Sequence, residues 1–181
     1  NFVEALKYLA GRAGVRLPEE EFSKEARASA DLKSRLLEIQ KRAASFYYYQ
    51  LWQESGRQGL DYLKNRQLSD ETIKKFGLGY SPKYSGTLYK YLKSKGYTDE
   101  LLKESGLFHI EERRGMQDKF WNRVMFPIMD VNNRVIGFGG RVMGDAKPKY
   151  LNSPETKVFD KSRNLYGLNI ARTSRKPYLI I

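Results

Sequence analysis

A polar loop in the second half of the chain carries the residue types that bind phosphate. Residues 147–156 read KPKYLNSPET, and Lys161 and Arg163 follow shortly after. Lysine and arginine neutralise phosphate charge, Asn, Ser and Thr donate hydrogen bonds to its oxygens, and tyrosine offers a face to an unpaired base. The loop is therefore a candidate phosphate-binding segment, although its composition also fits an ordinary solvated loop.

A glycine-rich segment, GFGGRVMG at residues 137–144, precedes this loop. It is not a dinucleotide-binding fingerprint, because Val142 stands where the third glycine belongs and the segment ends a hairpin instead of opening a helix. The phosphate-loop pattern GxxxxGK[ST] does not occur either. One interpretation is that these glycines let the backbone approach another group closely, with Arg141 beside them. The alternative is that they serve only the twist of a strand.

Metal-dependent nucleotidyl transfer needs paired carboxylates, because two metal ions must neutralise the attacking and leaving oxygens. In residues 111–181 the one adjacent acidic pair, Glu111 and Glu112, is followed by two arginines, which predicts an exposed charged turn. The aspartates Asp130, Asp145 and Asp160 are isolated in sequence. The chain has no cysteine and one histidine, His109, so neither a thiolate nor a histidine metal cluster can form. Taken alone, the sequence shows no catalytic centre.

The net charge indicates a polyanionic partner. The chain has 33 Lys and Arg against 21 Asp and Glu, a net of +12, and residues 111–181 hold 14 basic and 7 acidic residues. Neutralising phosphates with Lys and Arg releases condensed counterions, which favours nucleic acid. A basic surface kept for solubility and an anionic membrane are the alternatives. No apolar run of eighteen residues occurs and the start is amphipathic, so we expect a cytoplasmic protein without a membrane partner.

Helical periodicity dominates the first half of the chain. A first helix is expected to end at Gly14, a linker to follow at residues 18–22, and a long helix to begin near Ala30. The long helix has one apolar stripe, formed by Leu32, Leu36, Ile39, Ala43 and Phe46. Aromatic residues at 46–49 and Trp52 could stack on bases, but at helical spacing we favour packing in the core.

Short elements follow, and then strands. Ser69 is the expected N-cap of a short helix, because acidic residues follow it in the first turn. Two more short helices are expected at 88–92 and 99–103. Alternation predicts a hairpin over 121–141, turning at Asn132 and Asn133, and a further strand at 178–181. The predicted fold class is α+β: a helical amino-terminal part followed by a small mixed or antiparallel sheet. A strand at the very end suggests that the chain is a fragment.

Three segments resemble the polymerase core of bacterial DnaG-type primases. They are YLKNRQLSDETIKKFGLGYSP (62–82), FWNRVMFPIMDVNNRVIGFGGRV (120–142) and KPKYLNSPETKVFDKSRNLYGL (147–168). The opening FVEALKYLAGRAGVRLPE is similar to the segment that follows this family's zinc ribbon. The resemblance implies a division into residues 1–28 after the zinc ribbon, residues 29–176 as the basic amino-terminal subdomain, and residues 177–181 as the first strand of the Toprim subdomain.

The resemblance also implies a function. The chain would be the part of a DNA-directed RNA polymerase that binds template and nucleotide phosphates while short RNA primers are made for replication, and would be inactive alone. Mg²⁺ or Mn²⁺ would bind the Toprim part and Zn²⁺ the zinc ribbon. Expected partners are single-stranded DNA template, the RNA–DNA hybrid, NTPs, a guanosine tetraphosphate alarmone, and the replicative helicase through a carboxy-terminal domain. The alternative is a free-standing single-stranded-DNA-binding module with no catalytic role.

In this family a cleft facing Toprim is lined by basic and polar side chains. The matching positions here are Arg123, Arg141, Lys149, Tyr150, Asn152 and Lys161, with Lys119, Lys147, Ser153 and Arg163 as further candidates. Trp121 stands where other members often carry a basic residue, and Lys119 is expected to take over that contact. Which of these residues touch template and which touch nucleotide phosphate stays open.

Overall fold

The first unit of the chain is helical. A computed structural model describes residues 2–14 and 19–173 and divides the chain into units of residues 1–34 and 35–181. The first unit holds α1 (Phe2–Ala13), followed by Gly14 at φ +67°, and the beginning of α2 (Glu19–Leu51). The predicted linker is wrong for residues 19–22, which are already helical; consecutive glutamates favour the first turn of a helix. Pro18 and the strand predicted at 178–181 lie outside the described residues.

In the second unit, α2 presents one buried stripe. Leu36, Ile39 and Ala43 are fully buried as predicted, but the stripe continues through Tyr47 and Leu51. Phe46 lies at its edge, half-buried and stacked on Tyr91 at 5.1 Å. Core packing is thus confirmed for Tyr47, whereas Tyr49 is 61% exposed.

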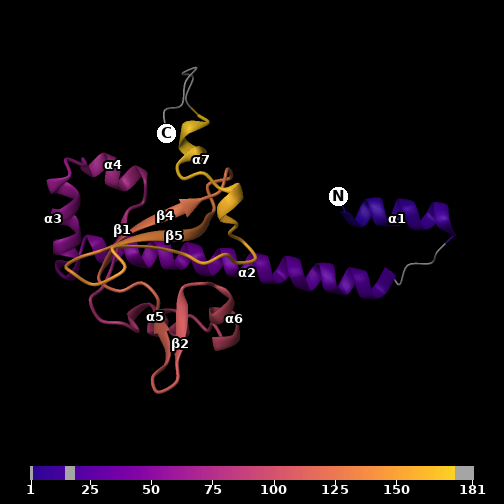
Figure 1. Cartoon of the computed structure of the whole chain (residues 1–181), viewed down its shortest axis with the longest axis horizontal. Helices are drawn as coiled ribbons and strands as arrows, with labels where there is room; N and C mark the ends of the chain where they lie inside the picture. The colour runs from indigo at the N-terminus through magenta and orange to yellow at the C-terminus, as the bar shows by residue number, and fades with distance from the viewer. Residues whose placement is uncertain (1, 15–18, 174–181) are drawn as a thin grey trace. The chain divides into compact units, whose positions relative to one another are not determined.

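A four-stranded antiparallel sheet packs against α2. Its strand order is β1 (Gly79–Ser81), β4 (Arg123–Met129), β5 (Val135–Val142) and β6 (Tyr150–Asn152). The α+β class and the predicted hairpin are confirmed, with Asn133 at φ +61° in the turn. The carboxyl-terminal part of α2 runs along one face, which we call the inner face (Figure 1), where Tyr47 meets Phe138 edge-on at 5.4 Å. A Cβ on Gly79 would lie 2.7 Å from the Tyr47 backbone, so only glycine allows this approach.

The opposite, outer face is covered at the β1 end by α3 (Arg57–Asn65) and α4 (Asp70–Lys75), which follow the short η1 (Glu54–Gly56). The cluster buried there is made of Leu51, Leu63, Ile73, Leu78, Tyr80, Val124 and Met143. Ser69 caps α4 as predicted, because its Oγ accepts a 3.1 Å hydrogen bond from the Thr72 amide. Toward β5 and β6 the outer face lines a cavity.

A buried carboxylate joins α5 (Thr87–Ser94) to the separate hairpin of β2 (Phe108–Glu111) and β3 (Gly115–Asp118). Asp118 accepts hydrogen bonds from the amides of Gly86, Leu88 and Tyr89 at 2.9–3.0 Å. These groups open α5, so a strand 30 residues away supplies its cap. Burial raises the pKa of Asp118, and the amide donors oppose that rise. Residue Glu112, in the predicted charged turn between β2 and β3, is exposed.

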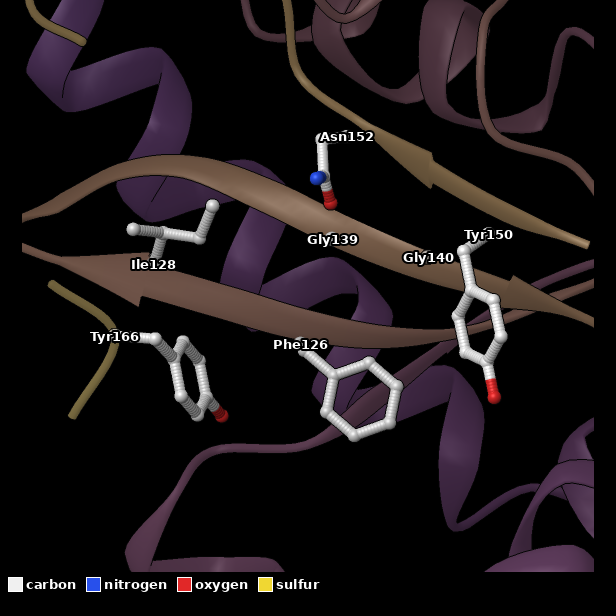
Figure 2. A pocket seen from close by; sticks show the side chains of 7 residues that line it. All are labelled: Phe126, Ile128, Gly139, Gly140, Tyr150, Asn152 and Tyr166. Carbon is white, nitrogen blue, oxygen red and sulfur yellow. The ribbon is translucent and has the colours of Figure 1, made fainter. Parts of the chain in front are cut away.

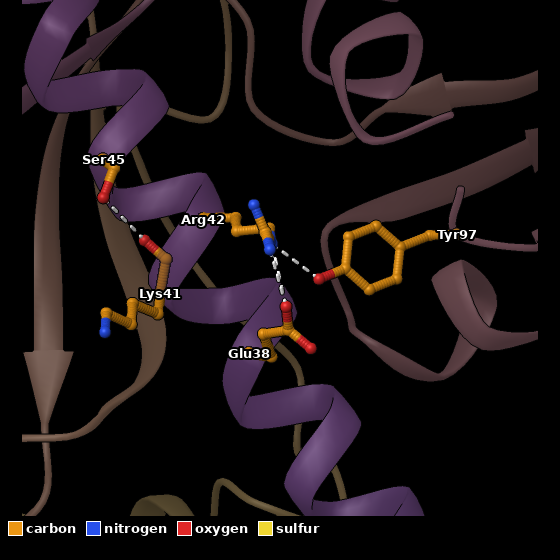
Figure 3. Close-up of polar contacts among 5 residues, drawn as sticks. All are labelled: Glu38, Lys41, Arg42, Ser45 and Tyr97. Atoms are coloured by element: carbon orange, nitrogen blue, oxygen red, sulfur yellow. Dashed lines mark hydrogen bonds and ion pairs between the residues drawn. The ribbon is translucent and has the colours of Figure 1, made fainter. Parts of the chain in front are cut away.

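One polar contact ties α2 to the segment between α5 and α6 (Asp99–Glu104). Arg42 Nε donates to Glu38 Oε1 at 3.0 Å and to the Tyr97 hydroxyl at 2.8 Å (Figure 3). Ser45 Oγ donates to the Lys41 carbonyl on the same helix. Because Glu38 and Arg42 are about half-exposed, the ion pair contributes little and the buried Tyr97 ring fixes the position.

After β6 the chain forms two short helices, η2 (Lys161–Arg163) and α7 (Leu168–Ala171). Asn169, on α7, donates to Asn133 Oδ1 at 2.9 Å and so fastens α7 to the β4–β5 turn. No helix in the described part of the chain is long and apolar enough to cross a membrane.

Candidate nucleic-acid and phosphate interface

The part of the outer face toward β5 and β6 forms a groove. Its cavity is about 350 Å³ and is lined by Phe126, Ile128, Gly139, Gly140, Tyr150, Asn152 and Tyr166 (Figure 2). The register places Phe126 opposite Gly139, and Gly139 opposite Asn152, so these three form one row across β4, β5 and β6. Side chains in one such row lie on one face of the sheet, which is why residues distant in sequence meet here.

Gly139 makes the floor of the groove. A Cβ at this position would lie 3.1 Å from Asn152 Oδ1 and 4.0 Å from the Phe126 Cβ. Figure 2 shows Asn152 above this glycine and the Phe126 ring beside it. The geometry favours the interpretation that this glycine permits close approach, since a side chain would fill the hollow.

Two tyrosines give the groove aromatic walls. Tyr150 is 63% exposed on the edge strand β6, and Tyr166 precedes α7 and stacks on Phe76 with 6.3 Å between ring centroids. Desolvation raises the pKa of Tyr166 to about 12, so its hydroxyl stays neutral at physiological pH. Aromatic rings of this kind stack on nucleobases with little regard to sequence.

Arg141 lies in the next row along β5, opposite Tyr150. Its guanidinium carbon is 4.6 Å from the ring centroid of Tyr62 on α3, and its Nη1 donates to the Val142 carbonyl. Within the described residues, its buried Nε has no hydrogen-bond partner and no carboxylate pairs with the side chain. The charge of Arg141 is therefore not neutralised by any described carboxylate and stays available to an outside anion.

The predicted lysines Lys147, Lys149 and Lys161 are all exposed. Lys149 immediately precedes β6, and its carbonyl accepts from the Val142 amide at 3.0 Å, which fastens the loop to β5. Lys161 begins η2, whose cap is Asp160, and Lys147 is exposed as well. Among ion pairs between described residues, none involves these three lysines, whereas Arg163 pairs with Asp160 at 3.4 Å.

The structure does not bring Arg123 to the groove. Arg123 is 2% exposed, belongs to the inner-face row, and donates from Nη1 to the carbonyls of Gly140 (3.3 Å) and Pro148 (3.0 Å). Burial lowers the pKa of its guanidinium, which still stays charged. Ser153 is also buried, and its Oγ accepts from the Phe138 amide at 2.9 Å. The side chains of Arg123 and Ser153 therefore hold the loop at residues 147–156 in place. Lys119, which directly follows β3, is half-buried.

Comparison with known proteins gives the family. A model of the DNA primase catalytic core, N-terminal domain, matches residues 46–172. The chain belongs to this family. It is 41% identical to the DNA primase of Clostridium acetobutylicum over 171 residues and to that of Pseudomonas putida over 174 residues. These matches cover 94% and 95% of the chain but 28% and 26% of the relatives, so the chain spans about a quarter of their length.

Solved primase structures share the fold. One is a DnaG primase catalytic domain bound to single-stranded DNA, with a TM-score of 0.73 and 39% identity, covering 80% of this chain and 45% of that one. Another is the RNA polymerase domain of Mycobacterium tuberculosis primase DnaG with a double-stranded oligomer that carries a 6-nucleotide overhang (TM-score 0.73, 34% identity, 77% and 44% coverage). The suspected relationship to bacterial DnaG-type primases is thereby confirmed.

The primase domain carries no acidic cluster suited to a metal ion in residues 2–14 and 19–173. Three aspartates of its second half serve the structure: Asp118 caps α5, Asp130 holds the β4–β5 turn, and Asp160 caps η2. The residues present do not fit a metal centre, and we assign no metal-dependent step to them.

Sequence reasoning about the primase domain missed four residues at or beside the groove: Phe126, Ile128, Tyr62 and Tyr166. Alternation predicts Phe126 and Ile128 only as residues of a strand. Their alternation signals which face they share, but not that this face stays open. Tyr62 and Tyr166 come from helical and loop segments far from β5, and no local pattern marks them.

Proposed function

We propose that this domain holds single-stranded template and nucleotide phosphates in a DNA primase, a polymerase that makes RNA primers for DNA replication. The observation that carries the proposal is the groove itself, which has a glycine floor and aromatic walls. Arg141 lies on β5, Lys149 directly precedes β6, and no carboxylate pairs with either among the described residues. The relative bound to single-stranded DNA supports the assignment. The work of the site would be to keep template and triphosphate in register.

Each kind of side chain suits one task. Tyr150 and Tyr166 would stack on bases, while Arg141, Lys149 and Lys161 would neutralise phosphates and Asn152 would donate hydrogen bonds. Arg123 and Ser153 would act indirectly, by holding the loop that carries Lys149. Single-stranded template, the RNA–DNA hybrid, NTPs and a guanosine tetraphosphate alarmone would all present such phosphates, and separate titrations with each would tell them apart.

The remaining chemistry is proposed for other parts of the protein. Mg²⁺ or Mn²⁺ bound by a Toprim subdomain would stabilise the reacting phosphate oxygens, and a zinc ribbon and a helicase-binding domain would complete the primase. In this division the chain comprises the segment at 1–28, the basic subdomain at 29–176 and the start of Toprim at 177–181, and it is inactive alone. Primer synthesis would place the protein at the replication fork in the cytoplasm.

The test uses the complete primase that contains this chain. Lys149→Ala or Lys161→Ala is expected to lower primer synthesis at least about tenfold, because one charge-assisted phosphate contact is lost. Lys103→Ala, an exposed lysine on α6, is the matched control and should leave synthesis unchanged. Equal melting temperatures would show that the fold is intact. Unchanged synthesis in both variants would overturn the assignment.

Salt dependence separates a phosphate-lined groove from apolar binding. The affinity for single-stranded DNA should fall by about 0.7 log units per neutralised phosphate for each tenfold rise in salt. Lys149→Ala should reduce that slope by about one phosphate, measured by anisotropy of a labelled oligonucleotide. If the variants bind DNA less well but primer synthesis is unaffected, the alternative of a binding module without catalytic role gains support.

A further inference from the structure

Two arginines share the ring of Tyr62. The guanidinium carbon of Arg141 is 4.6 Å from the ring centroid, and that of Arg66 is 5.6 Å from it. Arg66 lies one helical turn after Tyr62, just beyond the end of α3, whereas Arg141 comes from β5. The ring therefore joins the helix that covers the outer face to the strand that borders the groove.

The ring itself is held in place. Tyr62 is half-buried and packs against the apolar cluster that contains Leu63 and Val124. An arginine stacks well on the face of such a ring because its guanidinium is planar and weakly hydrated.

The contact orients a cation without neutralising it. Among described residues Arg141 has no carboxylate partner, its Nη1 is bound to the neighbouring Val142 carbonyl, and its Nε lacks an acceptor. A carboxylate in place of the ring would fix the side chain equally well but would cancel the charge that a phosphate needs. The aromatic face avoids that conflict.

We propose that Tyr62 is a positioning residue, which holds the Arg141 guanidinium toward phosphate in the groove. The inference rests on the proposed function, since it assigns a support to one of its phosphate-binding residues. The shared ligand chemistry is phosphate, from either the template backbone or an incoming nucleoside triphosphate. The rival explanation is that Tyr62 serves packing alone, because it touches the core cluster.

The experiment compares Tyr62→Phe and Tyr62→Leu with Arg141→Ala and with the double variant Tyr62→Leu/Arg141→Ala, all in the complete primase. Tyr62→Met joins the set in case leucine prevents folding. Three quantities are measured: the melting temperature, the Kd for a fluorescein-labelled oligo(dT), and the KM for NTPs in primer synthesis. Tyr62→Phe keeps the ring and should retain wild-type values.

Tyr62→Leu should raise Kd or KM by about 2- to 30-fold, the range of a cation–π contact. A rise in the oligo(dT) Kd alone identifies template phosphate as the ligand, and a rise in KM alone identifies nucleotide phosphate. In the Arg141→Ala background, Tyr62→Leu should add nothing further, because the residue it positions is absent.

Two results overturn the inference in distinguishable ways. If Arg141→Ala weakens binding but Tyr62→Leu does not, or if the two effects multiply in the double variant, Tyr62 is a packing residue and the proposed function stands. If Arg141→Ala changes neither Kd nor KM, the phosphate-binding role of Arg141 fails, and the support assigned to Tyr62 fails with it.

Discussion

Arg123 and Arg141 lie on paired strands, one residue out of register, and the sheet sends them to opposite faces. Arg141 pairs with Val124, whereas Arg123 pairs with Val142. Arg123 is buried and its Nη1 donates to two backbone carbonyls of other segments, while Arg141 is half-buried, rests on the Tyr62 ring, and donates from Nη1 only to the adjacent Val142 carbonyl. Both belong to motifs shared with primases, yet only Arg141 lies on the face of the groove. A basic residue in such a motif can therefore either stabilise the fold or bind the ligand. Which of the two it does depends on the face of the sheet to which its position in the strand directs it.

The largest expected effect is the difference in unfolding free energy between the alanine variants of the two arginines. Arg123→Ala is expected to cost about 2–4 kcal/mol of unfolding free energy, because it leaves a buried cavity and two carbonyls without their donor. Arg141→Ala should cost less than about 1 kcal/mol, because its side chain is half-exposed and bonds only a neighbouring carbonyl.

Urea unfolding, followed by the fluorescence of Trp52 and Trp121, measures both changes. A similar loss in the two variants would break the comparison between the faces. The affinity for phosphate ligands should change in the opposite order, and Arg141→Ala should lower it more than Arg123→Ala does. Both affinities are measured under conditions in which Arg123→Ala is folded.

A pair of adjacent glycines offers a second contrast, of intermediate size. A Cβ at Gly140 would meet the buried Phe120 ring at 2.9 Å and Arg123 Cδ at 3.0 Å, so Gly140→Ala should destabilise the chain by about 1–3 kcal/mol. At Gly139 the nearest atom is the exposed Asn152 side chain, so Gly139→Ala should cost under about 1 kcal/mol.

The same two variants should separate in binding. Gly139→Ala partly fills the groove floor and should weaken oligonucleotide or nucleotide binding, measured by anisotropy and by KM. Gly140→Ala should bind normally at temperatures where it is folded. Normal binding by Gly139→Ala would show that the hollow above this glycine does not receive the ligand.

The smallest effect concerns the turn that keeps β4 and β5 in register. Burial acts to raise the pKa of Asp130, but hydrogen bonds from the Arg134 amide, the Arg134 side chain and the Asn132 amide outweigh it and hold the pKa below its ordinary value. A depressed pKa in the folded state stabilises the fold above the unfolded value near 3.8, and that contribution is lost as the pH falls through the folded pKa.

Asp130→Asn should remove this acid-dependent contribution, which we expect to be about 0.5–1 kcal/mol. Unfolding free energies of the two forms should differ near pH 6 and converge toward pH 2. A constant difference across that range would mean that the carboxylate charge plays no part in the turn.

Local signals in the sequence predicted the elements whose causes are local. Alternation and the Asn132–Asn133 pair predicted the β4–β5 hairpin, and Ser69 predicted the start of α4. The sequence predicts a loop at residues 150–152, because they lie between prolines. This prediction is wrong, since pairing with β5 makes these residues strand β6. The burial of Arg123 and the contact of Tyr62 with Arg141 likewise depend on which faces meet in three dimensions. The roles of the groove residues remain predictions, since motif matching gives their positions and not their ligands.

The cap that Asp118 supplies to α5 makes helix and hairpin a single cooperative unit. The first amides of α5 have their acceptor on β3, so an isolated peptide spanning α5 would lack the group that satisfies them. Opening β3 must release the first turn of α5, and both regions should exchange their amide hydrogens with one free energy. Fraying of the helix at its amino terminus must therefore break hydrogen bonds to a strand 30 residues later in the chain.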